Sequence, residues 1–173
     1  MLLIITSDEE GDCPFWQVDH PNVSIWKHTP LQHLPFQPDR PLMLGWTPGT
    51  VEANRTRPHK DLEWSFAGQD GPPGNRRREQ AVQVMRTMGG ELIISEGFLQ
   101  GLDRDAYFTL LRRSKVVPWP SGPNIPDTFR LYEALESGAV PIADATCPRG
   151  DWGYWHRVFP SPPVFPILSD WLR

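Results

Sequence analysis

Between residues 63 and 142, short apolar runs alternate with segments in which apolar residues recur at helical spacing. The apolar runs are EWSFAG (63–68), GELIIS (90–95), KVV (115–117) and AVPI (139–142). The intervening segments begin after Asn75, Asp103 and Asp127, which are good helix N-caps, and the third ends at Gly138, a typical helix stop. This order predicts a parallel sheet with right-handed crossovers, in which the loops after Phe66, Ile94 and Val117 converge at the carboxyl ends of the strands. Ligands bind at that edge of such sheets.

The third helical segment is predicted to have one packing face and one free face. Thr128, Leu131, Tyr132 and Leu135 share the first face, and Arg130, Glu133 and Ser137 share the second. A Pro/Gly-rich loop (120–124) precedes the segment. The unpaired backbone N–H groups and the positive dipole end of a helix N-terminus suit an anion such as a diphosphate. Arg130 would add a cation at that point.

Three arginines, Arg76, Arg77 and Arg78, occupy the first turn of the helical segment that Asn75 caps. Cations there oppose the helix dipole, at a cost of about 0.3–1 kcal/mol each when they are exposed. A bound anion would reverse the sign of that effect. Electrostatics alone leaves two interpretations open: a solvated basic end partly offset by Glu79, or an anion site.

The chain before residue 62 has a different pattern. Short apolar runs at Leu2–Thr6, Val23–Trp26 and Leu42–Gly45 predict a smaller β-rich N-terminal part, residues 1–50. Residues 51–61 are polar and basic without a period, which predicts a linker to a Rossmann-like domain at residues 62–173. The linker residues Arg55, Arg57 and Lys60 are candidates to attract a phosphate, although a solvated loop explains them more simply. The expected fold class is therefore α/β.

Charge and cysteine content exclude several classes of protein. A net charge of -4 gives no argument for a broad electrostatic hold on nucleic acid or on an anionic membrane. Cys13 and Cys147 are far apart, so neither a disulfide framework nor a zinc site is indicated, and a cytoplasmic location is expected. The opening MLLIIT is too short an apolar run for a signal peptide or a membrane span. The 20 prolines predict short regular elements.

Two stretches carry a resemblance to a known family. The run SGPNIPDTFRLYEALESGAVPI (121–142) resembles the sugar-nucleotide half of glycosyltransferases with the GT-B fold, most closely the exostosin-like group with its R-x-x-E-A-x-x-x-G-x-x-P-[IV] pattern. Upstream, WSFAGQDGPPGNRRR (64–78) resembles the strand, glycine turn and arginine-started helix that open that half. The resemblance covers about residues 63–171 well, and residues 2–48 only loosely, as a partial acceptor-side segment. Because a two-domain enzyme needs roughly twice the usual domain length of about 100–200 residues, some of the acceptor half is expected to be missing or reduced.

The resemblance implies a glycosyltransferase that moves a sugar from a nucleoside-diphosphate sugar to a hydroxyl acceptor such as a glycan. In that family the glutamate at the position of Glu133 holds the ribose hydroxyls of the donor, for which a carboxylate is well suited. An exposed ion pair with Arg130 is the alternative explanation of Glu133. The donor-binding residues that the resemblance implies are Gly68, Arg76 or Arg77, Ser121, Gly122, Arg130 and Glu133.

Arg130 would stabilise the leaving diphosphate, so that no metal ion and no cofactor are expected. Asp103-Arg104-Asp105 has the spacing of the motif of metal-dependent transferases, but a helix start explains it more simply.

An acceptor-side base would be needed to activate the acceptor hydroxyl. Asp8 and Glu9 follow the first strand, where ligands bind in α/β sheets, although a solvated turn explains them more simply. His20 is the third candidate, although a lone histidine before a proline is typical of a turn.

Two other functions compete with this one. A truncated relative would keep the donor site and act as a non-catalytic nucleotide- or glycan-binding module. A phosphate-binding protein of another class, such as a hydrolase, is disfavoured because the sequence has no G-x-S-x-G, P-loop or metal-ligand cluster.

Overall fold

The structure is a computed structural model that describes residues 1–6, 13–14, 17–18, 20–28, 40–45, 47, 50, 59–71, 75–97, 100–147, 153–159, 161 and 165–172. The predictions for Asp8, Glu9, Arg55 and Arg57 lie outside the described residues. Within the described residues, no helix is both long and apolar enough to cross a membrane.

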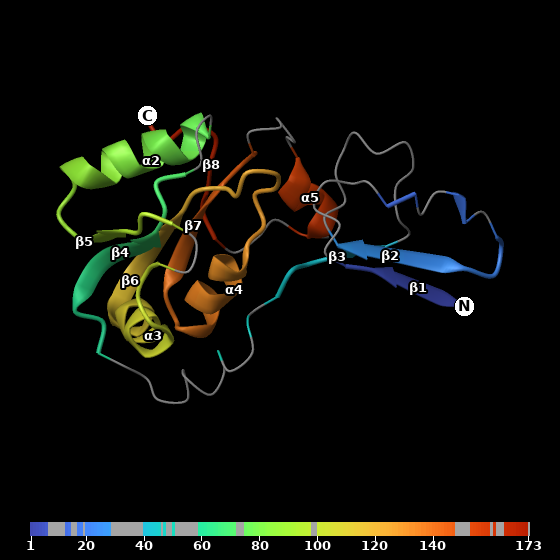
Figure 1. Cartoon of the computed structure of the whole chain (residues 1–173), viewed down its shortest axis with the longest axis horizontal. Coiled ribbons are helices and arrows are strands. Elements are labelled where there is room, and N and C mark those ends of the chain that lie inside the picture. Colours follow the sequence, from blue (N-terminus) through green and yellow to red (C-terminus); the bar gives the residue numbers. More distant parts are fainter. Residues whose placement is uncertain are drawn as a thin grey trace.

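The C-terminal part is built on a parallel sheet of five strands in the order β5-β4-β6-β7-β8 (Figure 1). The strands are β4 (Leu62–Gly68), β5 (Glu91–Ile94), β6 (Ser114–Trp119), β7 (Val140–Asp144) and β8 (Ile167–Leu168). The helices between them are α2 (Arg76–Thr87), α3 (Arg104–Arg113), α4 (Phe129–Glu136) and the short α5 (Tyr154–Val158). The predicted α/β fold with a Rossmann-like parallel sheet is confirmed.

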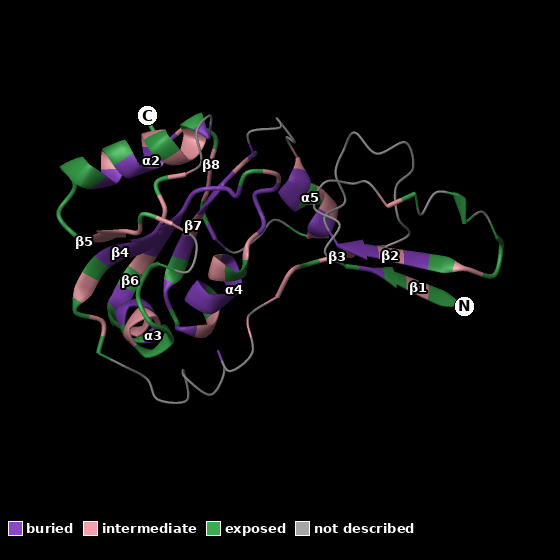
Figure 2. Cartoon of the chain, viewed as in Figure 1, coloured by how far each residue is buried: buried purple, intermediate pink, exposed green. Residues whose placement is uncertain are grey.

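Helices cover both faces of this sheet. Residues of α2 pack with Trp64 and Phe66 of β4 on one face, and residues of α3 and α4 pack with Val117 of β6 on the other. Strands β4 and β6 are buried over most of their length (Figure 2). Burial on both faces accounts for the near-continuous apolar runs that these strands show in the sequence.

The strand order reverses between β4 and β6. From β4 the chain passes through α2 to β5 on one side, and from β6 it passes through α4 to β7 on the other side. The two connections therefore leave a crevice above the carboxyl ends of β4 and β6, which is the usual ligand position in such sheets.

Three of the predicted helix signals are confirmed. The Asn75 side chain accepts a hydrogen bond from the Arg78 N–H at the start of α2, at 3.2 Å. Asp103 does the same for Ala106 at the start of α3, at 2.8 Å. Gly138 follows α4 with φ +68°, a left-handed conformation that favours glycine.

The prediction that Asp127 caps α4 is wrong. The N-cap is Thr128, and Asp127 is buried, with Oδ2 accepting hydrogen bonds from the Leu44 N–H (3.2 Å) and the hydroxyls of Tyr132 (3.0 Å) and Tyr154 (3.1 Å). All three donors bond Oδ2, whereas Oδ1 is buried without a partner among the described residues. Burial nevertheless raises the pKa of Asp127 to about 6, although these three hydrogen bonds oppose the shift.

The two predicted faces of α4 are also partly wrong. Leu135, expected to pack, is 40% exposed, whereas Glu133, expected on the free face, is only 6% exposed. Leu131 and Tyr132 are buried as predicted. The helix is therefore covered on more than one side, and the residues that cover Glu133 define the site described below.

The N-terminal part contains a three-stranded parallel sheet in the order β1-β2-β3. Its strands are β1 (Leu2–Ile5), β2 (Ser24–His28) and β3 (Arg40–Leu42). Ile5 and Ile25 of this sheet pack with Ile125, which lies in the loop between β6 and α4. The small sheet is thus joined to the loop that leads into α4.

Candidate functional site

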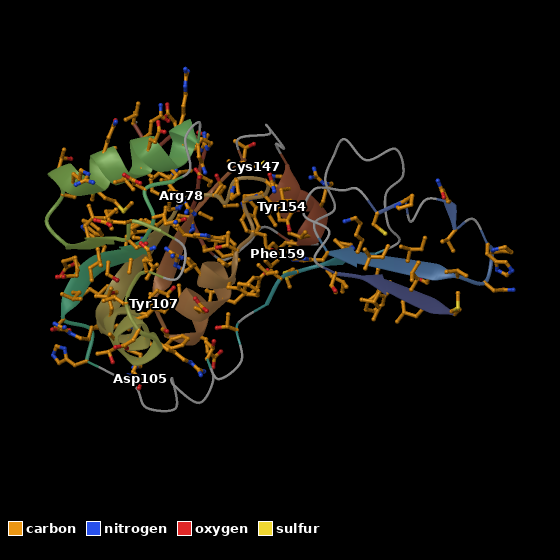
Figure 3. The ribbon with its side chains drawn as sticks, in the orientation of Figure 1. Arg78, Asp105, Tyr107, Cys147, Tyr154 and Phe159 are labelled. Carbon is orange, nitrogen blue, oxygen red and sulfur yellow. The ribbon has the colours of Figure 1, made fainter. Side chains whose placement is uncertain are left out.

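A cavity of about 930 Å³ lies at the carboxyl ends of β4, β5 and β6. Its walls include Thr47, Gly68, Asp70, Arg78, Ser95, Glu96, Tyr107, Gly122, Thr128, Phe129, Arg130 and Glu133. The prediction that the loops after Phe66, Ile94 and Val117 converge at one site is confirmed, because residues from all three loops line it. Figure 3 labels Arg78 and Tyr107, which reach the cavity from helices on opposite faces of the sheet.

Glu133 is the buried acid of the cavity. Its Oε1 accepts a hydrogen bond from the Thr47 hydroxyl at 2.7 Å, and its Oε2 accepts one from the Tyr107 hydroxyl at 3.0 Å. Thr47 precedes Glu133 by 86 residues, so the contact joins distant parts of the chain. The exposed ion pair with Arg130, which the sequence left open, is not formed within the described part of the chain.

Arg130 is directed instead towards the end of β4. Its guanidinium carbon lies 5.3 Å from the centre of the Phe66 ring, a cation–π distance. A Cβ atom at Gly68 would overlap the guanidinium group. Gly68 therefore has a spatial role in the structure, because the absence of a side chain allows Arg130 to cross the strand end and reach the cavity.

Of the three arginines at the start of α2, Arg78 is the one that lines the cavity. Its Nη2 donates to the Pro120 carbonyl at 3.2 Å, while its buried Nε has no partner within the described residues. Burial first, and then the nearby charge of Arg130, lower the pKa of Arg78 to about 10, while the charge of Asp144 opposes the shift. Arg78 is still a cation at neutral pH, and it forms no ion pair within the described residues.

The two arginines that the sequence favoured for diphosphate binding lie elsewhere. Arg76 is exposed, and Arg77 forms an ion pair of 2.7 Å with Asp144, whose side chain is fully buried. Neither lines the cavity. The sequence contained a signal that could have distinguished Arg78. Ala81, Val82 and Met85 form the buried stripe of α2, and position 78, three or four residues before the first two of them, continues that stripe better than positions 76 and 77 do.

The predicted loop residues Ser121 and Gly122 have different environments. The Ser121 N–H donates to Asp144 Oδ2 at 2.6 Å, and the residue is buried outside the cavity lining. Gly122 lines the cavity, with its N–H donating to the Ile125 carbonyl at 3.0 Å. The loop is therefore held mainly by its own backbone and by Asp144.

The N-terminus of α4 opens on the cavity. Its N-cap, Thr128, makes no capping hydrogen bond through its side chain, and Oγ1 is buried without a partner among the described residues. Phe129, the first residue of the helix, is 43% exposed and lines the cavity. The first backbone N–H groups and the positive dipole end of α4 thus lie beside Arg130.

The described acceptor-side candidate does not approach this cavity. His20 is exposed in a turn, where its Nδ1 accepts a hydrogen bond from the Asn22 N–H at 3.2 Å, and it is not part of the lining. Among the described residues, no group of three or more His, Cys, Asp or Glu side chains is arranged to hold a metal ion.

Comparison of the sequence with models of known protein families and with curated proteins found no match. The chemistry of the cavity must therefore be argued from its own residues. It combines two cations and a helix N-terminus with a buried carboxylate, whereas the acids Asp70 and Glu96 are exposed.

Proposed function

We propose that this cavity binds a nucleoside-diphosphate sugar and that the chain transfers the sugar to a hydroxyl acceptor such as a glycan. The observation that carries the proposal is the position of Arg78, Arg130 and Glu133 around one cavity at the reversal of strand order. This position is where mononucleotides and dinucleotides bind in doubly wound sheets. The resemblance of residues 121–142 to exostosin-like glycosyltransferases gives the reaction class.

The cationic side of the cavity fits a diphosphate. No described carboxylate forms an ion pair with Arg78 or Arg130. The two guanidinium groups and the start of α4 supply N–H donors and positive charge, which phosphate oxygens bind well. A bound anion would also relieve the repulsion between the arginines that lowers the pKa of Arg78.

The buried carboxylate of Glu133 fits the ribose. A carboxylate offers about four lone-pair positions, and Thr47 and Tyr107 use two of them, one on each oxygen. One remaining position on each oxygen can accept a hydroxyl of a ribose diol. The same residue would thus be fixed by the protein and would still recognise the donor.

In the proposed transfer, negative charge accumulates on the leaving diphosphate as its bond to the sugar breaks. Arg78 and Arg130 would stabilise that charge, because preorganised donors act most strongly where charge develops in the transition state. The acceptor hydroxyl loses its proton to a base, for which Asp8 and Glu9 remain the candidates. No cofactor other than the donor substrate is required in this scheme.

Titration calorimetry with UDP and GDP, with and without magnesium, tests the donor site. We expect saturable binding of one nucleotide that weakens by about tenfold or more in Arg78→Met, Arg130→Met and Glu133→Gln, since each loses an interaction with a charged group. Arg76→Met is the matched control, because Arg76 is exposed on the same helical turn and does not line the cavity. A folded wild-type chain that binds neither nucleotide would refute the proposal.

A non-catalytic nucleotide- or glycan-binding module is the second candidate. It is favoured by one observation: the described part of the chain supplies the donor side of the cavity, whereas His20 lies away from it. Incubation with UDP- and GDP-sugars and release of the free nucleotide separate the two functions. Nucleotide binding without turnover of any donor, in the presence of glycan acceptors, would favour the binding module.

A further inference from the structure

Two residues that follow β3, Leu44 and Thr47, are hydrogen-bonded to Asp127, just before α4, and to Glu133 of α4. The Leu44 N–H donates to Asp127 Oδ2 at 3.2 Å, immediately before α4, and the Thr47 hydroxyl donates to Glu133 Oε1 at 2.7 Å, within α4. Gly45, between them, has φ +75°, a conformation that favours glycine. Leu44 is thus bonded just before α4, and Thr47 is bonded within α4 at the cavity.

Thr47 is held on its other side as well. The Thr50 hydroxyl donates to the Thr47 carbonyl at 2.7 Å, and the two hydroxyl oxygens are 3.2 Å apart. Thr50 is fully buried. The Thr47 hydroxyl is therefore fixed by the fold before any ligand binds.

The partners of Glu133 fix both of its oxygens. Thr47 holds Oε1 from the segment after β3, and Tyr107 holds Oε2 from α3 on the opposite side. An unrestrained glutamate side chain would lose conformational entropy when a ligand binds, and a restrained one has already lost it on folding. Restraint of this carboxylate therefore contributes directly to ligand affinity.

We propose that Thr47 is a positioning residue that fixes the Glu133 carboxylate for the donor nucleotide and thereby couples the cavity to the segment after β3. The inference rests on the proposed function, and it adds a residue outside the Rossmann-like domain to the donor site. Because coupling between two sites is reciprocal, nucleotide bound at Glu133 would strengthen the attachment of Thr47.

Three variants test the role of the hydroxyl. Thr47→Val removes the hydroxyl and keeps the shape, and Thr47→Ser keeps the hydroxyl. Thr87→Val is the matched control, since Thr87 is exposed, does not line the cavity and donates its hydroxyl to the Val84 carbonyl of its own helix, at 2.8 Å. We expect the affinity for UDP or GDP to fall by up to about tenfold in Thr47→Val, because the ligand must then restrain a Glu133 side chain that Thr47 no longer fixes. Thr47→Ser should stay within about twofold of the wild type, and Thr87→Val should be unchanged.

A second measurement needs no nucleotide. Urea unfolding of Thr47→Val, Glu133→Met and the double variant forms a double-mutant cycle. We expect Thr47→Val to lower the unfolding midpoint in the wild-type background and to have little effect in the Glu133→Met background, because the acceptor of the hydroxyl is gone. Additive effects on the midpoint would show that the two side chains do not interact, and would overturn the proposal whatever the nucleotide result.

The remaining outcomes are also decisive. Coupling in the unfolding cycle together with unchanged nucleotide affinity in Thr47→Val would make Thr47 a structural contact and overturn its positioning role. Coupling in a wild-type chain that binds neither UDP nor GDP would refute the proposed function and, with it, the positioning role, while the contact with Glu133 itself would stand. Coupling together with weaker binding in Thr47→Val and recovery in Thr47→Ser would support the proposal.

Discussion

The ion pair between Arg77 and Asp144 is expected to be the most costly to break among the described ion pairs. Asp144 is fully buried at the end of β7, and Arg77 Nε and Nη2 both donate to its Oδ1, at 3.2 and 2.7 Å. The Asp144 carboxylate also accepts hydrogen bonds from the Ser121 N–H and the Trp171 indole N–H. We predict that Arg77→Met strongly destabilises the fold, because it leaves a buried carboxylate without its cation.

The size of the effect follows from these contacts. Removing one partner of a buried ion pair costs about 3–5 kcal/mol. Two donors to Asp144 remain in Arg77→Met, and Arg77 itself is 18% exposed, so we expect a value at the lower end, about 3 kcal/mol. A loss of that size is a large fraction of the roughly 5–15 kcal/mol that stabilises a typical domain.

Urea unfolding followed by tryptophan fluorescence measures this loss, with Arg76→Met as the matched control. The exposed Arg76 should change the free energy of unfolding by no more than about 0.5 kcal/mol. Replacing Asp144 by Asn in the Arg77→Met background should recover part of the lost stability, since the unpaired charge is then removed. Equal unfolding midpoints for Arg77→Met and Arg76→Met would refute the reasoning.

Three further predictions concern other contacts. The pKa of Asp127 is raised by burial to about 6 from 3.8, so between these values the folded state holds a proton that the unfolded state has lost, and stability falls as pH rises through this window by up to about 3 kcal/mol. In urea titrations between pH 4 and 7, Asp127→Asn should remove that part of the pH dependence, and identical pH profiles would contradict the assignment. Gly68→Ala should displace Arg130 and weaken nucleotide binding about tenfold in calorimetry. Gly89→Ala is the control, since there is open space around Gly89, and equal affinities of the two variants for the nucleotide would argue against the spatial role of Gly68. Lys60 donates to carbonyls at the ends of α3 and α4, at 3.5 and 2.7 Å, so its replacement by Met should cost about 1 kcal/mol in thermal unfolding, and an unchanged melting temperature would show that the linker cation is merely solvated.

The parts of this structure that depend on local pattern were predictable from the sequence. Helix caps at Asn75 and Asp103 and the stop at Gly138 depend on neighbouring residues, and the structure confirms all three. The alternation of strands and helices also predicted a cavity at the carboxyl ends of the strands, because chain connectivity alone fixes which loops meet there.

The residues that complete the site were not predictable in the same way. Thr47 reaches Glu133 across 86 positions of sequence, and no local pattern records such a contact. The linker residue Lys60 was interpreted as a solvated residue or a phosphate ligand, whereas it lies at two helix C-termini that come together only in the folded chain. In each case tertiary packing brings the polar partner into place, and such contacts cannot be predicted from residue propensities or from the spacing of apolar residues.

Among the described residues of the C-terminal part, three buried carboxylates are stabilised in three different ways, and the comparison distinguishes the one in the cavity. Asp144 is paired with a cation, and Asp127 takes its hydrogen bonds from two tyrosines and a backbone N–H. Glu133 takes its two from hydroxyl groups, although two arginines line the same cavity.

Those arginines form no ion pair with Glu133, although the charge of Asp144 favours the cationic form of Arg78. Arg130 lies over the ring of Phe66, and the buried Nε of Arg78 has no partner in the described part of the chain. The positive charge of Arg130 also lowers the pKa of Arg78, in addition to the effect of burial. An ion pair with Glu133 would offset the repulsion between the arginines and part of the cost of burying the charges. Cations that line a cavity without an ion pair favour the binding of an external anion, and they are the main physical support for the proposal that this cavity binds a phosphorylated ligand.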